Sequence, residues 1–137
     1  MTLQEFFKGD RFAVLAGCKL TEIGEGYARA CLIVEEQHLN GGDICQGGAI
    51  FTLADLTFAA AVNSHLTLTV STSSNITFFR PVPLGATIYA EARELIDHPR
   101  IPYAEVRVTD EEGHLVALFT SSGYRKQAVK LEGVEKP

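Results

Sequence analysis

The longest apolar stretch of the chain covers residues 48–64 and contains one charged residue, Asp55. Its apolar residues fall on every side of a helix rather than on one stripe, and no proline interrupts them. A membrane span would need ~20 apolar residues, and Thr52, Thr57 and Asn63 break the run. The pattern therefore predicts a central helix buried in a soluble fold, where a carboxylate is costly unless it is paired or functional.

Two short helical patterns precede this helix. Residues 2–5, Thr-Leu-Gln-Glu, form a capping box, which predicts a short helix ending near residue 9 with Phe6 and Phe7 packed inward. Asp10 can cap a second short helix that continues to residue 16 and is closed by Gly17. We therefore expect residues 1–17 to form two short helices.

Runs rich in β-branched and aromatic residues, separated by turn residues, predict strands in the rest of the chain. We expect these strands at residues 18–23, 27–34, 70–79, 86–96, 101–110 and 114–124. In the second strand, Tyr27, Arg29, Cys31 and Ile33 alternate onto one face. Short turns between successive strands favour antiparallel pairing, so the whole pattern predicts an α+β domain with one long helix.

Length and charge limit the alternatives. A chain of 137 residues can form one core but not two domains, so we expect a single domain over residues 1–125 and a polar, frayed tail over 126–137. The net charge of −5 argues against a general nucleic-acid-binding surface. Because no secretory leader pattern is present, we expect a cytoplasmic protein that does not insert into membranes.

The three cysteines fit a reducing compartment. Cys18, Cys31 and Cys45 are odd in number and lack C-x-x-C spacing, which argues against a disulfide framework and a zinc site. We expect Cys18 and Cys31 to pack in the core. Cys45 precedes the long helix, where a thiol pKa can be lowered, but no histidine adjoins it, so we do not expect a catalytic thiol.

The histidines provide no metal-binding pattern. His38 is placed to support the loop before the long helix, whereas His65, His98 and His114 fall in or near predicted turns and should be solvated. No spacing of histidines and carboxylates matches a metal-ligand set, so we expect neither a metal nor a redox cofactor.

The start of the long helix carries the candidate chemistry. The glycine pair at 47–48 lets backbone N–H groups approach a ligand at the positive end of the helix dipole, which suits a developing oxyanion. Asn40, this glycine pair and Leu-Ala-Asp at 53–55 resemble hotdog-fold acyl-CoA thioesterases of the PaaI (phenylacetate-pathway) type. The resemblance continues through Asn-Ile-Thr-Phe-Phe-Arg-Pro at 75–81 and covers roughly residues 10–125. It implies a curved sheet wrapped around the central helix, the hotdog arrangement.

The resemblance also implies roles for single residues. Asp55 would attack the thioester carbonyl or activate a water, although it could instead accept a hydrogen bond from Thr52. The N–H of Gly47 would stabilise the oxyanion, although glycine at a loop-to-helix junction commonly serves a tight turn. Asn40 would orient the loop or a water, and Ser71 would position the attacking water. Their alternatives are a plain turn residue and an ordinary strand hydroxyl.

One position departs from the family pattern. Where these thioesterases usually have a histidine before the glycine pair, this chain has Gln46. Glutamine can donate a hydrogen bond to a thioester carbonyl but cannot exchange protons near neutral pH, which disfavours hydratase chemistry more than hydrolysis. We therefore predict hydrolysis of aryl-CoA or medium-chain acyl-CoA, with a hotdog hydratase or dehydratase and a non-catalytic acyl-CoA sensor as alternatives. Arg80, Arg93 or Arg100 could contact the coenzyme A phosphates, although such arginines are usually only solvated.

The spacing of the main candidates predicts that one chain does not complete the site. Asp55 lies eight residues beyond Gly47, which separates their backbones by ~12 Å along an ideal helix. An aspartate side chain is too short to close that gap. The resemblance implies a neighbouring antiparallel helix across a two-fold dimer, so Gly47 of one chain should face Asp55 and Ser71 of another. We expect a homodimer, or a homotetramer built from such dimers.

Overall fold

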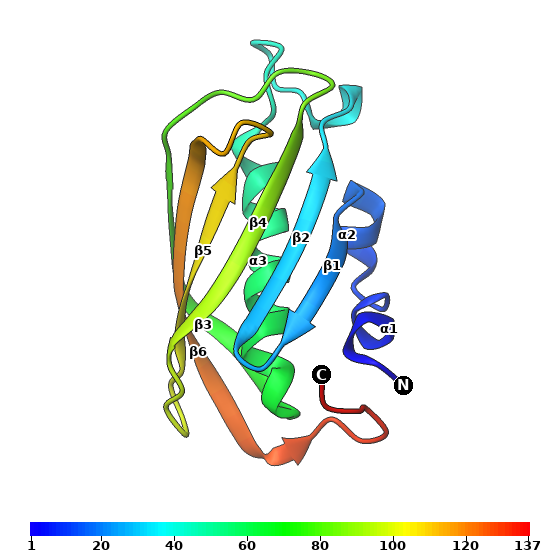
Figure 1. The fold of residues 1–137 in the computed structure, drawn as a ribbon, viewed down its shortest axis with the longest axis vertical. Helices are drawn as coiled ribbons and strands as arrows, with labels where there is room; N and C mark the ends of the chain where they lie inside the picture. The colour runs from blue at the N-terminus through cyan, green and yellow to red at the C-terminus, as the bar shows by residue number, and fades with distance from the viewer.

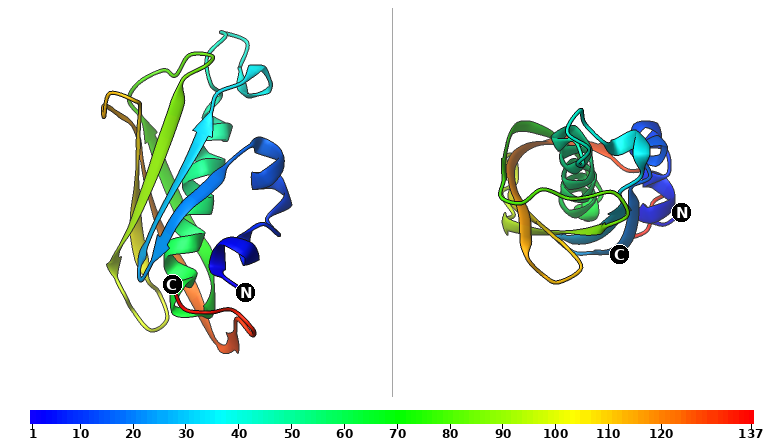
Figure 2. Two further views of the ribbon diagram at one scale, coloured as in Figure 1. Left: turned by 45° about the vertical axis from the view of Figure 1, so that its right-hand side comes forward. Right: turned by 90° about the horizontal axis from the view of Figure 1, so that it is seen from above.

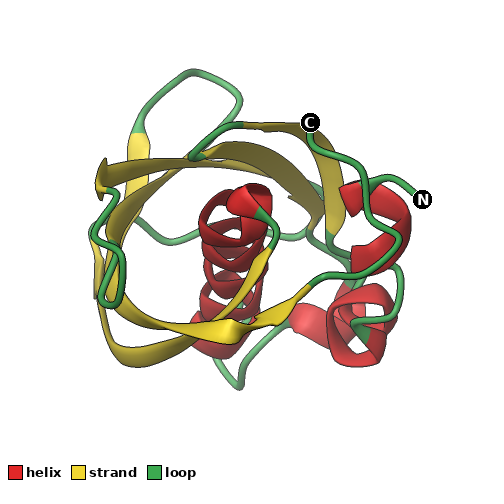
Figure 3. Cartoon of the chain, turned by 90° about the horizontal axis from the view of Figure 1, so that it is seen from below, coloured by secondary structure: helices red, strands yellow, loops and turns green.

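The computed structural model describes all 137 residues. A six-stranded antiparallel sheet curves around one long helix (Figures 1, 2 and 3). The helices are α1 (Leu3–Phe7), α2 (Arg11–Ala16) and α3 (Gly47–Val62), and two 3₁₀ turns are η1 (Glu36–His38) and η2 (Asn63–His65). The strands are β1 (Lys19–Gly24), β2 (Tyr27–Ile33), β3 (Thr67–Phe78), β4 (Thr87–Ile96), β5 (Tyr103–Thr109) and β6 (Leu115–Lys130). They lie in the order β1-β2-β4-β5-β6-β3. This arrangement confirms the predicted α+β hotdog fold.

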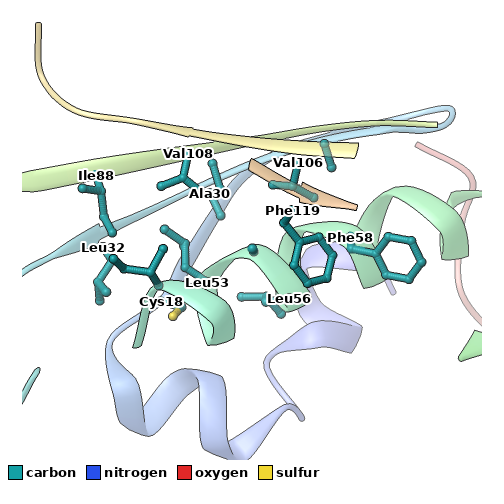
Figure 4. Close-up of a cluster of buried hydrophobic side chains, with 14 of the residues drawn as sticks. Cys18, Ala30, Leu32, Leu53, Leu56, Phe58, Ile88, Val106, Val108 and Phe119 are labelled. Carbon is teal, nitrogen blue, oxygen red and sulfur yellow. The ribbon is translucent and has the colours of Figure 1, made fainter. Parts of the chain in front are cut away.

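The concave face of the sheet packs on α3 to form the core (Figure 4). Along β4, Ile88, Ala90 and Ala92 are fully buried while the residues between them are more exposed, as a half-buried strand requires. Phe119 of β6 contacts two rings of α3, with centroid distances of 5.3 Å to Phe51 and 6.0 Å to Phe58. Small strand residues and these large rings together fix the position of α3 against the sheet.

The prediction that α3 is buried on every side holds for only part of its surface. Phe51, Thr52, Asp55 and Ala59 are half-buried, and their spacing of three and four residues places them on one stripe of the helix. No helix in the structure has the length and apolar composition needed to cross a membrane. The stripe is therefore a surface of α3 that the chain leaves partly uncovered.

β3 forms one edge of the sheet, and most of its length is exposed. The opposite edge, β1, packs against α1 (Figure 1). A long open edge presents unpaired backbone N–H and C=O groups that a strand from another chain can pair with. The two edges of this sheet are thus unequal, because β3 is the longer edge and lacks the packing against α1 that β1 has.

Both N-terminal helices form with the predicted caps. The Thr2 hydroxyl accepts from the Glu5 N–H while the Glu5 carboxylate accepts from the Thr2 N–H, and Gly17 ends α2 with φ of 88°. The prediction for Phe6 was wrong, because its side chain is 37% exposed and Leu3 is the residue of α1 that becomes buried. A five-residue helix has little surface to bury, and here Leu3 supplies the inward side.

The C-terminal segment is ordered, in contrast to the predicted frayed tail. β6 continues to Lys130, which pairs with Thr67 at the beginning of β3. Beyond it, Val134 is 9% exposed, and the chain's two ends are joined because the Met1 ammonium group donates to the Gly133 carbonyl at 2.6 Å. Pairing with a strand about 60 residues earlier is a long-range contact that local polarity does not reveal.

Two further predictions need correction. Cys18 is buried in the core, but Cys31 lies on the outward face of β2, partly buried and outside the core. His65 was expected in solvent, yet its side chain is 17% exposed and lies 2.8 Å from the Glu94 carboxylate. In both cases the contacts of the folded sheet decide the environment.

Candidate active site

The first turn of α3 presents two free backbone donors. Gln46 is the N-cap residue, and its side chain makes no capping hydrogen bond. Its carbonyl accepts from Ala49 at 3.0 Å, whereas the N–H groups of Gly47 and Gly48 have no acceptor within the chain. Because these donors lie at the positive end of a 16-residue helix, they can bind an oxyanion or a polarised carbonyl oxygen.

The glycine pair lets two neighbouring side chains approach the backbone closely and does not serve a positive-φ turn. Neither glycine has a positive φ. A Cβ atom at Gly47 would lie 2.9 Å from the ring of Phe78, and one at Gly48 would lie 2.5 Å from Oε1 of Gln46. The tight-turn alternative for Gly47 therefore does not describe this junction, because the missing side chains leave room for Phe78 and Gln46.

Asn40 organises the loop that leads to these donors. Its Oδ1 accepts from the N–H of Gly42 at 2.8 Å and from that of Ile44 at 3.3 Å. The loop is tied to its surroundings through the Gln46 N–H, which donates to the His38 carbonyl at 2.7 Å. Asn40 thus acts as a turn residue, and its side chain also lines a pocket of about 440 Å³ together with Gly47.

Asp55 has no hydrogen-bond or ion-pair partner within the chain, and Thr52 instead donates to the Gly48 carbonyl at 2.8 Å. Burial raises the pKa of Asp55, and the nearby negative charge of Asp10 raises it further. A half-buried, unpaired carboxylate on the uncovered stripe is poised to act as a base or nucleophile.

One chain does not bring the five predicted residues together. Asn40, Gln46 and Gly47 meet at the beginning of α3. Asp55 lies ~12 Å farther along the helix axis. Ser71 lies on β3 opposite Gly123, seven residues from the Phe78 ring that covers Gly47, and an extended strand spans ~23 Å over that distance.

Two pockets flank the start of α3, and the sequence did not reveal either. The pocket on the β3 side contains Asn40, Gly47, Phe78 and Arg80. The pocket on the α2 side has a volume of about 640 Å³ and contains Gln46, Gly48 and side chains of α2. The exposed apolar residues of α2 were the available signal, but their position beside Gly48 depends on helix packing.

Other candidate groups do not form a second reactive centre. Cys45 is 5% exposed, and burial raises the pKa of its thiol, the opposite of what a nucleophilic thiolate needs. His65, Glu94 and Asp97 offer metal-ligand atoms within 4.8 Å of one another. Arg125 already occupies this cluster, since its guanidinium lies 2.7 Å from Asp97 and 3.6 Å from Glu94.

Known proteins with the same features identify the family. Residues 42–117 match the thioesterase superfamily. The chain is 31% identical over 119 residues to the acyl-coenzyme A thioesterase PaaI of Escherichia coli, covering 87% of this chain and 85% of that protein. The structure of E. coli PaaI superposes with a TM-score of 0.85 at 30% identity, with 88% of each chain covered. A PaaI protein from Thermus thermophilus superposes with a TM-score of 0.82 at 34% identity, covering 85% of this chain and 99% of that one. This chain therefore belongs to the thioesterase superfamily and is a hotdog-fold protein of the PaaI type.

Proposed function

We propose that this protein hydrolyses acyl-CoA thioesters at a site built from two copies of the chain. One observation carries the proposal. The same helix presents free oxyanion donors at Gly47 and Gly48 and an unpaired carboxylate at Asp55, too far along the helix for the two to meet in one chain. The PaaI relative that is named an acyl-CoA thioesterase supports the choice of reaction.

The open β3 edge supports a specific pairing of the two copies. If two β3 strands pair antiparallel about a two-fold axis, the sheets become continuous and the two α3 helices lie side by side in opposite directions. The half-buried stripe of each helix then meets the other helix. Gly47 of one copy faces Asp55 and Ser71 of the second, and every dimer contains two such sites.

The chemistry follows from these positions. The N–H groups of Gly47 and Gly48 donate to the thioester oxygen, and the free side-chain amide of Gln46 can donate to it as well. Asp55 of the second copy removes a proton from water, which attacks the carbonyl carbon, or attacks that carbon itself. Collapse of the tetrahedral intermediate breaks the C–S bond, and the departing thiolate takes a proton. When water attacks, this step releases the acid directly; when Asp55 attacks, it leaves an anhydride with Asp55 that water then hydrolyses. The products are a carboxylic acid and free coenzyme A.

Gln46 argues against the hydratase, and Asp55 argues against the non-catalytic sensor. A hydratase must move a proton on the carbon chain of an enoyl thioester, and an amide cannot supply it near neutral pH. A sensor without catalysis would have no use for an unpaired carboxylate with a raised pKa. We expect the purified protein to release thiol from aryl-CoA or medium-chain acyl-CoA, detected with a thiol-trapping reagent, and to leave enoyl-CoA unhydrated. Hydration without thiol release would select the hydratase.

Mixed dimers test the shared site. Asp55→Asn and Asn40→Ala, once each is shown to be inactive alone, are refolded together. Mixed dimers then contain one site with both lesions and one site with neither. With random assortment, half the dimers are mixed and half of their sites are intact, so activity should return to about a quarter of wild type. If mass spectrometry confirms mixed dimers but activity stays near zero, the site is contained in one chain.

A further inference from the structure

The pockets on the two sides of the α3 start differ in chemistry. Both pockets are lined largely by apolar residues, but the pocket on the β3 side also includes Arg80, a cation suited to the phosphate-bearing arm of coenzyme A. The pocket on the α2 side is lined by no aspartate, glutamate, lysine or arginine. A thioester held by the donors of Gly47 and Gly48 would lie between them, with a cation in the direction of one arm and no charged residue in the direction of the other.

We propose that the pocket on the α2 side, named here the acyl pocket, binds the acyl group of the thioester and that Phe12 and Leu15 determine which acyl groups fit. The inference rests on the proposed function and adds the residues that select the substrate. The acyl pocket lies between α2 and α3, with Phe12 and Leu15 on one side and Gln46, Gly48 and Ala49 on the other. Its continuity with the candidate oxyanion donors distinguishes it from an ordinary surface hollow.

The exposure of α2 supports this occupant. Phe12 is 67% exposed and Leu15 is 80% exposed, and their spacing of three residues places them on the same face of α2. Large apolar side chains grouped on a surface commonly mark a binding site. The volume of about 640 Å³ falls within the range of small-molecule pockets, ~300–1,000 Å³. An aryl or medium-length alkyl group has the size and the apolar character that this pocket accepts.

His38 holds the two sides of the acyl pocket in a fixed relation. Its ring Nδ1 accepts from the Glu35 N–H at 2.9 Å, so the Nε2–H is the donor that contacts the Ala16 carbonyl at 2.5 Å. Its own carbonyl accepts from the Gln46 N–H at 2.7 Å. One residue, 5% exposed, therefore ties the end of α2 to the residue that precedes α3. The pocket is formed before the substrate arrives, which lowers the cost of ordering it on binding.

Adjacent residues of α2 provide a matched test. Leu15→Trp fills the acyl pocket, whereas Val14→Trp adds the same bulk on the other side of the helix, where Val14 is 54% exposed and lines a different pocket. The specificity constant kcat/KM is measured for acetyl-CoA, saturated acyl-CoAs of increasing length and phenylacetyl-CoA. We expect Leu15→Trp to lower kcat/KM at least ~10-fold for the longer and aryl substrates and to leave acetyl-CoA nearly unchanged. Val14→Trp should reproduce the wild-type profile.

A second change keeps the test independent of crowding in one variant. Phe12→Ala enlarges the acyl pocket and should move the preferred chain length upward. The proposal would be overturned if Leu15→Trp and Phe12→Ala both gave profiles of kcat/KM against acyl group parallel to that of wild type. A changed oligomer mass would also overturn it, because this face of α2 would then be an assembly surface. If wild type releases no thiol from any substrate, the proposed function fails by itself. The same comparison, made by calorimetry on acyl-CoA binding, then decides whether the pocket selects acyl groups.

Discussion

The two ends of α3 hold polar groups in contrasting states. At the C-terminal end, the Asn63 amide donates to the Ala59 and Thr69 carbonyls and accepts from the Thr69 N–H. The Ser64 hydroxyl accepts from the Gly26 N–H and donates to Ala61. These bonds connect the end of the helix to β3 and to the turn between β1 and β2.

Beyond that end, ion pairs continue the connection. His65 lies 2.8 Å from Glu94, and Arg125 lies 2.7 Å from Asp97. Two of these side chains are buried, since Glu94 is 6% exposed and Arg125 is 9% exposed. At the N-terminal end of α3, by contrast, the donors of the glycine pair at 47–48 have no partner in the chain. The comparison indicates that the C-terminal end is joined to the sheet by polar contacts and that the donors at the N-terminal end are available for chemistry.

The largest effect should follow from neutralising the unpaired carboxylate. Asp55→Asn should lower kcat by ~10²–10⁴-fold, because an amide is neither a base nor a carboxylate nucleophile. Since burial raises the pKa of Asp55, its ionised form is disfavoured in the folded protein, and this cost grows as pH rises through the folded pKa. The variant should therefore unfold at a higher temperature than wild type at neutral pH.

The matched control lies at the other end of α3. Glu94→Gln removes a carboxylate whose pKa burial also raises, but which already pairs with His65 and Arg125, so kcat of the folded protein should stay near wild type. If Asp55→Asn kept wild-type turnover, or Glu94→Gln abolished it in a folded protein, the functional contrast between the two ends would be incorrect.

The next largest effect concerns the paired end. Arg125→Met should lower the free energy of unfolding by ~3 kcal/mol in urea denaturation, because it removes the guanidinium from the buried cluster and leaves Glu94 with His65 alone. The Arg125 hydrogen bond also lowers the pKa of Asp97, so this pair stabilises the fold above the ordinary aspartate pKa, and the contribution is lost as pH falls through the folded pKa. The variant should therefore lose less stability on acidification than wild type.

Two comparisons test whether the expected loss of stability with Arg125→Met arises because the ion pairs are buried. Arg93→Met breaks an exposed pair with Glu91, where the arginine is 62% exposed, and should cost less than ~1 kcal/mol. The double variant Arg125→Met/Glu94→Gln should recover part of the loss, because no unpaired charge is then buried. Equal costs for Arg125→Met and Arg93→Met would show that the network contributes no more than a surface pair.

The contrast also explains what the sequence could predict. The oxyanion donors and Asp55 share one helix, so their separation follows from helical geometry alone. The N-terminal caps are local in the same way. His65 was mispredicted because its partner Glu94 lies 29 residues away, and the extension of β6 was missed because Lys130 pairs with Thr67. The acyl pocket requires α2 to pack beside α3, which no local pattern specifies.

The smallest predicted effect tests how the two helices interact electrostatically. Asp10 caps α2 by accepting from the Ala13 N–H at 3.0 Å, and its charge helps to raise the pKa of Asp55. Asp10→Asn keeps a good cap and removes that charge. The pKa of Asp55 should fall, so the acid limb of the profile of kcat/KM against pH should move to lower pH by a small amount. Activity at pH values well above the folded pKa of Asp55 should change little, because the carboxylate is ionised there in both proteins.

A charge removed elsewhere provides the control. Glu112 lies in the turn between β5 and β6 with its side chain 79% exposed, so Glu112→Gln makes the same change in net charge where solvent screens it. Its acid limb should coincide with that of wild type. Because a free carboxylate is required for attack, the shift with Asp10→Asn must have the sign of a lower pKa. A shift to higher pH, or an equal shift with Glu112→Gln, would show that the acid limb does not report Asp55 beside Asp10.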